Sequence, residues 1–206
     1  MERDAEIEAI LAERAISRVL FDYCQGVDRR DWPLVRACYF DDAVDSHGAF
    51  VGSPDDLIMW LQSRHEHVIS STHLLSNLSF RIDKERGLAR VESYILSLQI
   101  VDATAGDPFA GESAGPVFTQ IMSRYVDTFA ERADSDWRIL RRDVVFDWSR
   151  RCGLEDFMEV DASWPRARRD GADLLYAGWP DTAVADESAG DVQKTPSALA
   201  QRLRRS

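Results

Sequence analysis

The hydrophobic pattern of this chain changes period near Thr72, and this change limits the possible folds more than any other feature. Before Thr72, apolar residues recur every three or four positions, which is the spacing of one face of an α-helix. After Thr72, apolar and polar residues alternate, which is typical of strands with one buried side. Helices first and a curved antiparallel sheet after them make an α+β fold. With 206 residues, the chain is long enough to bury a sizeable core.

Three helices and one strand are expected in the first third of the chain. The pattern predicts a helix over residues 4–27 and a second, short helix over residues 32–39. Residues 43–51 are expected to form a strand. A third helix should begin after Ser53, because a serine at this position can cap the first turn.

The alternating part of the chain predicts four longer strands and one long loop. The strands are expected at residues 72–83, 88–101, 117–130 and 137–148. Residues 102–116 are rich in Gly, Ala, Asp and Pro, which favours a loop. Its length suggests that this loop, which includes Phe109, covers the mouth of a pocket.

The pattern fades after the last strand, so the chain is expected to hold one domain and a tail. We assign residues 1–150 to the α+β domain, 151–180 to an irregular extension and 181–206 to a flexible tail. The tail is rich in Ala, Ser, Asp and Gly, a composition that favours disorder. A basic helical end is expected at 198–205.

Charge and cysteine content exclude several classes of partner. The net charge of −11 disfavours nucleic acid and anionic membrane, because phosphate surfaces would repel the chain. No apolar run approaches the ~18 residues that span a bilayer. The acidic start does not resemble a secretory signal. Cys24, Cys38 and Cys152 are widely spaced, which predicts neither a disulfide framework nor a zinc site and favours the cytoplasm.

Tyr23 and Asp28 lie on or beside the apolar stripe of the first helix. A tyrosine on such a stripe is usually a core residue whose hydroxyl needs a partner. On a continuous helix, Asp28 follows Cys24 by one turn and must be paired or hydrogen-bonded, because burying a bare carboxylate is costly. Alternatively, the helix ends near Gly26 and Asp28 caps the turn before Trp32.

Arg142 and His73 are the polar candidates in the strands. Arg142 alternates with Leu140 and Val144 on an otherwise apolar face, so it forms a structural ion pair or holds negative charge on a bound molecule. His73 opens a strand, and imidazole changes charge near neutral pH, as a base for proton abstraction must. Alternation places His73 on the same face of the strand as Leu75. A bulge would alter this pattern, so the sequence leaves undecided which face of the sheet His73 lies on.

Further side chains are available to line a largely apolar pocket. They are His47, Phe50, Trp60, Tyr94, Phe118, Phe146 and Trp148. A hydrophobic substrate that contains a ring would fit such a pocket. No metal centre is expected, because His65 and His67 stand at a helix end with their rings apart.

Together, these residues resemble the SnoaL-like branch of the nuclear transport factor two-like superfamily. The resemblance rests on segment 15–32, on the Thr72-His73 strand start and on segment 136–142, and it covers roughly residues 8–150, with a weaker match over 164–176. Scytalone dehydratase, bile acid 7α-dehydratase and hexachlorocyclohexane dehydrochlorinase belong to this group. The resemblance implies a cone-shaped α+β barrel, in which a curved, mostly antiparallel sheet wraps around N-terminal helices and leaves a deep pocket. It also implies a homo-oligomer, a trimer or a dimer.

The resemblance also implies a lyase that needs no cofactor. Asp28 and His73 match the Asp–His dyad of the family, Tyr23 matches the tyrosine of the bile acid enzyme, and Arg142 matches an arginine on the last strand. His73, oriented by Asp28, would remove a proton from carbon. Arg142 would stabilise the negative charge that develops, and Tyr23 would hydrogen-bond or protonate the departing hydroxyl. An isomerase, a noncatalytic binder of small molecules and a small-subunit-like partner of a ring-hydroxylating oxygenase share the fold and remain alternatives.

Overall fold

The computed structural model describes residues 2–132 and 136–178. The described residues up to Leu175 belong to one compact unit, which holds all the α-helices and strands described below. The expected flexible tail, 181–206, and its basic helix, 198–205, lie outside the described residues.

Three α-helices precede the long strands, as the apolar spacing predicts. They are α1 (Glu2–Arg29), α2 (Trp32–Ala37) and α3 (Pro54–His65). The backbone of α1 continues through Gly26 to its last turn, so Asp28 is a helical residue and not the cap. Asp31 caps α2 by accepting a hydrogen bond from the Leu34 amide, and Ser53 caps α3 as expected.

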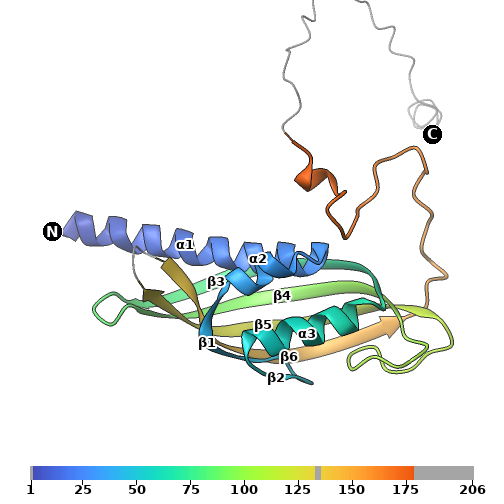
Figure 1. Cartoon of the computed structure of the whole chain (residues 1–206), viewed down its shortest axis with the longest axis horizontal. Coiled ribbons are helices and arrows are strands. Elements are labelled where there is room, and N and C mark those ends of the chain that lie inside the picture. The colour runs from blue at the N-terminus through green and yellow to red at the C-terminus, as the bar shows by residue number, and fades with distance from the viewer. Residues whose placement is uncertain (1, 133–135, 179–206) are drawn as a thin grey trace, which may run out of the picture. The chain divides into compact units, whose positions relative to one another are not determined.

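Six strands form one curved sheet that does not close on itself (Figure 1). They are β1 (Tyr39–Ser46), β2 (Val51–Gly52), β3 (Val68–Asp83), β4 (Leu88–Asp102), β5 (Pro116–Arg132) and β6 (Asp136–Cys152). Their order is β2-β1-β6-β5-β4-β3, and only β1 and β6 pair in parallel. The α+β class is confirmed. The expected single strand at 43–51 is instead two strands joined by a tight turn, and β3 begins earlier than Thr72.

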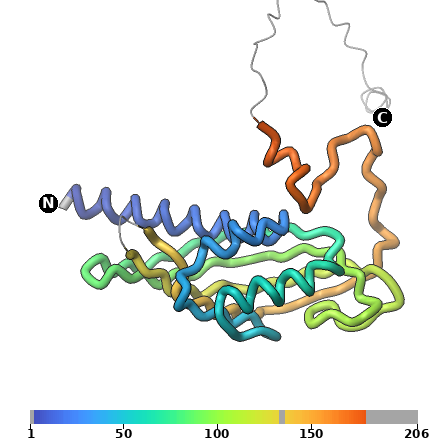
Figure 2. The backbone as a smooth tube through the Cα atoms, viewed as in Figure 1, coloured from blue at the N-terminus to red at the C-terminus, as the bar shows by residue number. Residues whose placement is uncertain are grey.

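The loop between β4 and β5 lies near the C-terminal end of α3 (Figure 2). An ion pair joins them, because Arg64 Nε of α3 is 2.9 Å from Asp107 Oδ2 of the loop. After β6, the described residues 153–173 contain no helix or strand, and a short 3-10 helix, η1 (Leu174–Tyr176), follows them.

A bulge in β3 sets the face on which His73 lies. The pairing with β4 shifts between Ser76 and Ser79, where Asn77 has a φ of 49°. Because of the extra residue, Leu75 and Leu78 both pack on the core beneath α1, although they are three positions apart. We call this side of the sheet the inner face. His73 is two residues before Leu75 and lies on the same inner face, which the alternation alone left open.

Similar bulges interrupt the pairing of β5 with β6. Phe146 pairs with Ser123 and Trp148 pairs with Met122, so one extra residue lies between them on β6. Consequently Phe146 is on the inner face and Trp148 is on the outer face, although simple alternation predicts a shared face. A second shift near Thr128 places Arg142 on the inner face.

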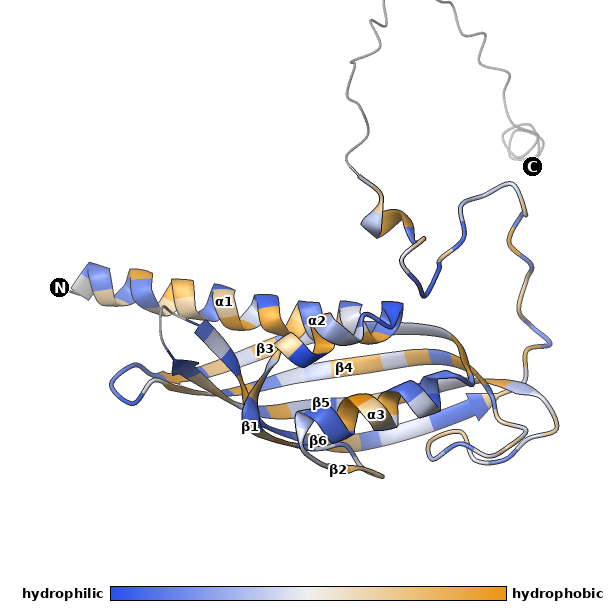
Figure 3. Ribbon diagram, viewed as in Figure 1, coloured by the Kyte–Doolittle hydropathy of each residue, from blue (hydrophilic) through white to orange (hydrophobic). Residues whose placement is uncertain are grey.

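The inner face of β4 is more polar than expected. Its buried residues include Ser93, Ser97 and Gln99, whereas Tyr94 and Leu96 belong to the half-buried outer face. The alternation of apolar and polar residues along β4 and β5 is visible in Figure 3. The expected regular alternation of β4 is confirmed, and the buried Ser93, Ser97 and Gln99 lie among apolar residues of the inner face.

Candidate active site

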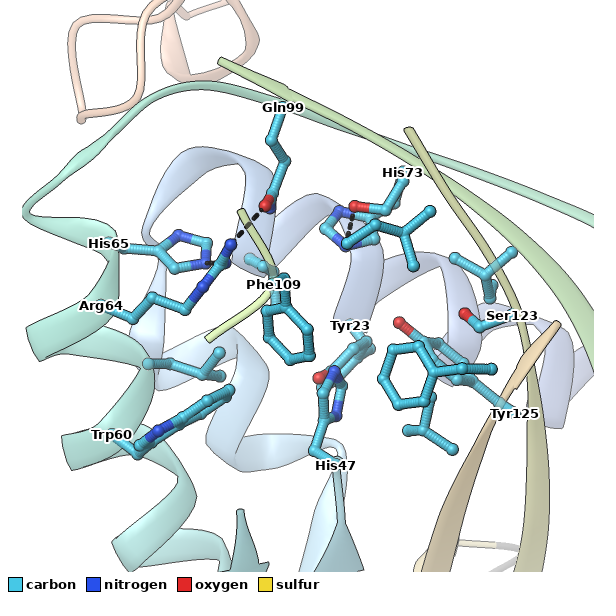
Figure 4. Close-up of a pocket in the computed structure, with 17 residues that line it drawn as sticks. Tyr23, His47, Trp60, Arg64, His65, His73, Gln99, Phe109, Ser123 and Tyr125 are labelled. Atoms are coloured by element: carbon cyan, nitrogen blue, oxygen red, sulfur yellow. Dashed lines mark hydrogen bonds between the residues drawn. The ribbon is translucent and has the colours of Figure 1, made fainter. Parts of the chain in front are cut away.

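A pocket opens between α1, α3 and the inner face of the sheet (Figure 4). It holds about 480 Å³ of space not filled by atoms, its open mouth included. The polar lining residues are Tyr23, His47, Arg64, His65, His73, Ser97, Gln99, Ser123 and Tyr125. The apolar lining residues are Val27, Trp60, Leu61, Ile95, Phe109, Ile121, Val144 and Phe146. Polar groups that converge in a largely buried pocket are typical of a small-molecule site.

Asp28 and His73 meet at one wall of this pocket. His73 Nδ1 lies 2.7 Å from Asp28 Oδ1, and the His73 amide donates to Asp28 Oδ2 at 2.8 Å. The Ser71 hydroxyl donates to Asp28 Oδ1 at 2.7 Å. Three donors therefore hold one carboxylate, and the carboxylate orients the imidazole.

These contacts keep Asp28 ionised although it is buried. Burial by itself raises the pKa of Asp28, but the charge of His73 and the hydrogen bonds from His73 and Ser71 outweigh it and lower the pKa below the ordinary value. A carboxylate can only accept, so the proton between the two residues is on His73 Nδ1. The other ring nitrogen, His73 Nε2, lies 3.3 Å from the Ser97 hydroxyl, and both residues line the pocket.

Tyr23 lines the pocket, but Arg142 lies behind it. The Arg142 guanidinium is fully buried and forms two hydrogen bonds with Asp127, of 2.8 and 2.7 Å. It stacks over the rings of Tyr23 and Tyr125, at 4.3 and 3.9 Å from their centroids. Burial by itself lowers the pKa of Arg142, but the charge of Asp127 raises it well above the ordinary value, so the guanidinium stays protonated. Arg142 can reach a bound molecule only through the two tyrosines.

A second carboxylate–imidazole pair lies at the end of β1. Asp45 is fully buried and accepts a hydrogen bond of 2.7 Å from the Tyr39 hydroxyl. His47 lines the pocket, and its Nδ1 is 3.4 Å from Asp45 Oδ1. The pocket therefore contains two histidines with buried carboxylates behind them.

The loop after β4 closes one side of the pocket with Phe109. The Phe109 ring stacks on Phe146 with centroids 5.7 Å apart and packs edge-on against Trp60 at 6.1 Å. Arg64 lies 4.9 Å from the centroid of the Phe109 ring while it pairs with Asp107. Phe109, from the loop expected to cover the mouth of the pocket, is a lining residue.

The C-terminal extension contacts the site through Arg169. Its guanidinium donates to the Asp28 carbonyl oxygen at 2.9 Å and lies 2.6 Å from His65 Nδ1. Burial lowers the pKa of Arg169 to about 10, which still leaves it protonated at neutral pH. Because a guanidinium has only donors, His65 Nδ1 must accept this hydrogen bond, which an imidazole nitrogen can do only when it carries no proton.

The buried His65 makes the stability of the protein depend on pH. Burial, with the charges of Arg169 and Arg64, lowers its pKa from 6.5 to about 2. Below pH 6.5 the unfolded chain therefore binds a proton that the folded chain does not, and the free energy of unfolding falls as pH falls. For one such group the slope is about 1.4 kcal/mol per pH unit.

We expect His65→Asn to reduce this slope, measured by urea unfolding between pH 6.5 and 5. Asn offers an acceptor to Arg169 but takes up no proton. The exposed His67, changed to Asn, is the matched control and should leave the slope as it is. A slope that His65→Asn leaves unchanged would mean that His65 titrates normally in the folded protein.

Several residues predicted for the pocket lie elsewhere. His47, Trp60 and Phe146 line it, whereas Phe50 is not a lining residue and stacks on Trp60 with ring centroids 5.6 Å apart. Three others are not lining residues and lie on the outer face: Tyr94, Phe118 and Trp148. The reason is that Tyr94 and Phe118 occupy outward-facing positions of β4 and β5, and a bulge in β6 separates the face of Trp148 from that of Phe146.

Other site residues were not predicted. Asp127 alternates with Tyr125 and Phe129, so the argument that singled out Arg142 would also have found its partner. Asp45 alternates with Ala43 in the same way. The roles of Arg64, Ser97 and Arg169 depend on contacts between distant segments and leave no local signal.

No group of three or more His, Cys, Asp or Glu within 2–132 and 136–178 is arranged to hold a metal ion. Among the same residues, no helix is both long and apolar enough to cross a bilayer.

Comparison with known proteins identifies the family. The model of a family described as "SnoaL-like domain" matches residues 8–143, more than half of the chain. The chain belongs to the SnoaL-like domain family. The matched range contains most of α1, the dyad and the buried arginine of β6, so the predicted family is confirmed. A comparison with curated proteins gave no match.

Solved structures share the fold of this SnoaL-like protein. A candidate scytalone dehydratase from Novosphingobium aromaticivorans is 21% identical, with 77% of this chain and 100% of that chain covered and a TM-score of 0.57. A hexachlorocyclohexane dehydrochlorinase (LinA, type 2) is 15% identical, with 75% and 97% covered and a TM-score of 0.63. A candidate aromatic ring hydroxylase from N. aromaticivorans is 17% identical, with 71% and 96% covered and a TM-score of 0.57. At these identities the likeness is one of fold.

Proposed function

We propose that this SnoaL-like protein is a lyase that eliminates water from a hydrophobic, ring-containing small molecule by proton abstraction. One observation carries the proposal: His73 lines the pocket while its Nδ1 is held 2.7 Å from the ionised Asp28. A base held in this way can remove a proton from a carbon next to a carbonyl group. The names of two proteins that share the fold, a dehydratase and a dehydrochlorinase, denote eliminations.

The other residues have supporting roles in this proposal. Tyr23 hydrogen-bonds the substrate, and the buried charge of Arg142 stabilises negative charge through the stacked Tyr23 and Tyr125. Trp60 and Phe146 contact the ring of the substrate, and Phe109 must move to admit it. All these steps use side chains alone.

The three cysteines are free thiols, as expected for a protein of the reducing cytoplasm.

The proposal is tested with a panel of aryl ketones and their β-hydroxy derivatives in D₂O. We expect the protein to exchange the proton next to the carbonyl, followed by NMR, and to form the conjugated enone, followed by ultraviolet absorption. Exchange without loss of water would identify an isomerase instead. Binding of these ketones without exchange would reject the enzyme and favour a noncatalytic binder. Stable copurification with a larger iron-containing chain would favour a structural subunit.

We also propose that the protein associates with itself through the outer face of the sheet. An apolar row crosses four strands there, because Leu74 pairs with Leu96, Leu96 with Met122 and Met122 with Trp148. Leu74 and Trp148 are each half exposed. A contiguous apolar patch that is exposed on a protein surface often marks a site where another protein binds.

We expect the wild type to be a dimer or trimer by light scattering, and Trp148→Glu to shift it toward the monomer. Met59→Glu is the matched control, because Met59 is an exposed apolar residue on α3, away from the row. A wild-type monomer at high protein concentration would contradict the proposal, as would equal dissociation of the two variants.

A further inference from the structure

The backbone at the end of β1 aims His47 into the pocket. The His47 amide donates to the Phe50 carbonyl oxygen at 2.7 Å, which closes a tight turn between β1 and β2. Gly48 has a φ of +68° in this turn, a conformation that favours glycine. The His47 ring packs between Trp60 and Tyr125, at centroid distances of 6.0 and 6.2 Å. Its position is therefore set by the fold.

The buried carboxylate of Asp45 faces the His47 ring, where it can orient the ring and stabilise a positive charge on it. Burial by itself raises the pKa of Asp45, but the close contact with His47 and the charge of Arg142 lower it below the ordinary value. The Tyr39 hydroxyl occupies Asp45 Oδ2 and leaves Oδ1 facing His47 Nδ1. The 3.4 Å between these atoms is long and not aligned as a hydrogen bond. Catalytic contacts of this length often tighten when the substrate binds.

The pocket therefore has two imidazole–carboxylate pairs on different elements. His73 comes from β3 and is paired with α1, whereas His47 comes from the turn after β1 (Figure 4). An elimination needs a base at one carbon and an acid at the group that leaves the next carbon. Tyr23 is poorly suited to be that acid, because burial and the charge of Asp45 raise its pKa above the ordinary value.

We propose that His47 is a second catalytic residue, which protonates the leaving hydroxyl while His73 acts as the base. This rests on the proposed function. His73 Nε2 takes the proton from the carbon next to the carbonyl, and the electron pair of that C–H bond forms the C=C bond. The C–O bond breaks with its electrons on oxygen, and His47 gives its proton to this oxygen, so water leaves. His73 then loses a proton to solvent and His47 regains one.

The dependence on the leaving group tests this role. Dehydration of an aryl β-hydroxy ketone needs an acid, whereas release of chloride from the matching β-chloro ketone does not. We expect His47→Gln to slow dehydration by about 10²-fold or more. Its exchange of the proton next to the carbonyl in D₂O, and its release of chloride above the uncatalysed rate, should stay close to those of the wild type. Asp45→Asn should show the same pattern, more weakly.

Each outcome separates the two proposals. Equal losses for hydroxyl and chloride in a folded His47→Gln protein, or no loss for either, would overturn the acid role and leave the lyase proposal intact. A wild type that neither exchanges nor eliminates any member of the panel would overturn both. Thermal unfolding shows whether each variant is folded. The exposed His67, changed to Gln, is the control and should retain both activities.

Discussion

His73→Gln should slow exchange of the proton next to the carbonyl by about 10²- to 10⁴-fold, with elimination slowed in parallel. Glutamine fills similar space and its amide can still donate to Asp28, but it takes up no proton near neutral pH. Binding of the ketone should therefore persist while the chemical step is lost. The loss should appear for hydroxyl and chloride leaving groups alike, because the base acts on both.

Asp28→Asn should cause a loss of the same order through the tautomer of His73. Asp28 accepts from the His73 amide, from His73 Nδ1 and from the Ser71 hydroxyl. An asparagine must turn its NH₂ group toward at least one of these donors. If the NH₂ faces His73 Nδ1, that nitrogen becomes the acceptor, and Nε2 carries the proton and no longer acts as a base.

The controls separate loss of the base from loss of the fold. Ser71→Ala removes one donor to Asp28 but leaves the Asp28–His73 contact, so it should retain exchange. NMR of the imidazole nitrogens reports whether the proton moves from Nδ1 to Nε2 in Asp28→Asn. Wild-type exchange rates in a folded His73→Gln protein would show that another group is the base.

Breaking the ion pair between Arg142 and Asp127 should have the largest effect on stability. Both side chains are buried, and two hydrogen bonds join them. Arg142→Met leaves the buried carboxylate of Asp127 without a positively charged partner. Asp127→Leu leaves the buried guanidinium of Arg142 without a negatively charged partner. Removal of one partner from a buried pair costs about 3 to 5 kcal/mol in the free energy of unfolding.

The double variant Arg142→Met/Asp127→Leu should recover much of this loss, because neither member of the pair is left buried without its partner. Urea unfolding of the two single variants and the double variant gives the coupling energy. Arg141→Met is the control: the neighbouring Arg141 pairs with Asp143 at the surface, where an ion pair contributes little. Additive losses in the double variant would show that the two charges do not depend on each other.

The double variant also tests how the layer behind the pocket contributes to catalysis. Without Arg142, the stacked Tyr23 and Tyr125 lose the positive charge at 4.3 and 3.9 Å from their ring centroids. If that charge stabilises the transition state through the tyrosines, a folded double variant should be slower than the wild type.

The amino-acid sequence by itself determined the parts of this protein that depend on consecutive residues. Apolar spacing placed α1 and α3, the alternation after Thr72 placed the strands, and a carboxylate beside the stripe of α1 singled out Asp28. The alternation along the last strand also singled out Arg142, as a charged residue on an apolar face. These features are local, because a helix or a strand repeats within a few residues.

The tertiary structure decided which of these residues meet. The bulge at Asn77 turned His73 toward Asp28, and a bulge in β6 sent Trp148 to the outer face. Strand pairing gave Arg142 its partner Asp127, and the extension brought Arg169 to His65. A single extra residue reverses the face of every side chain after it, and a contact between segments over a hundred residues apart has no local pattern. Periodicity therefore supplied the candidates, and only strand register and long-range packing could assemble them into a site.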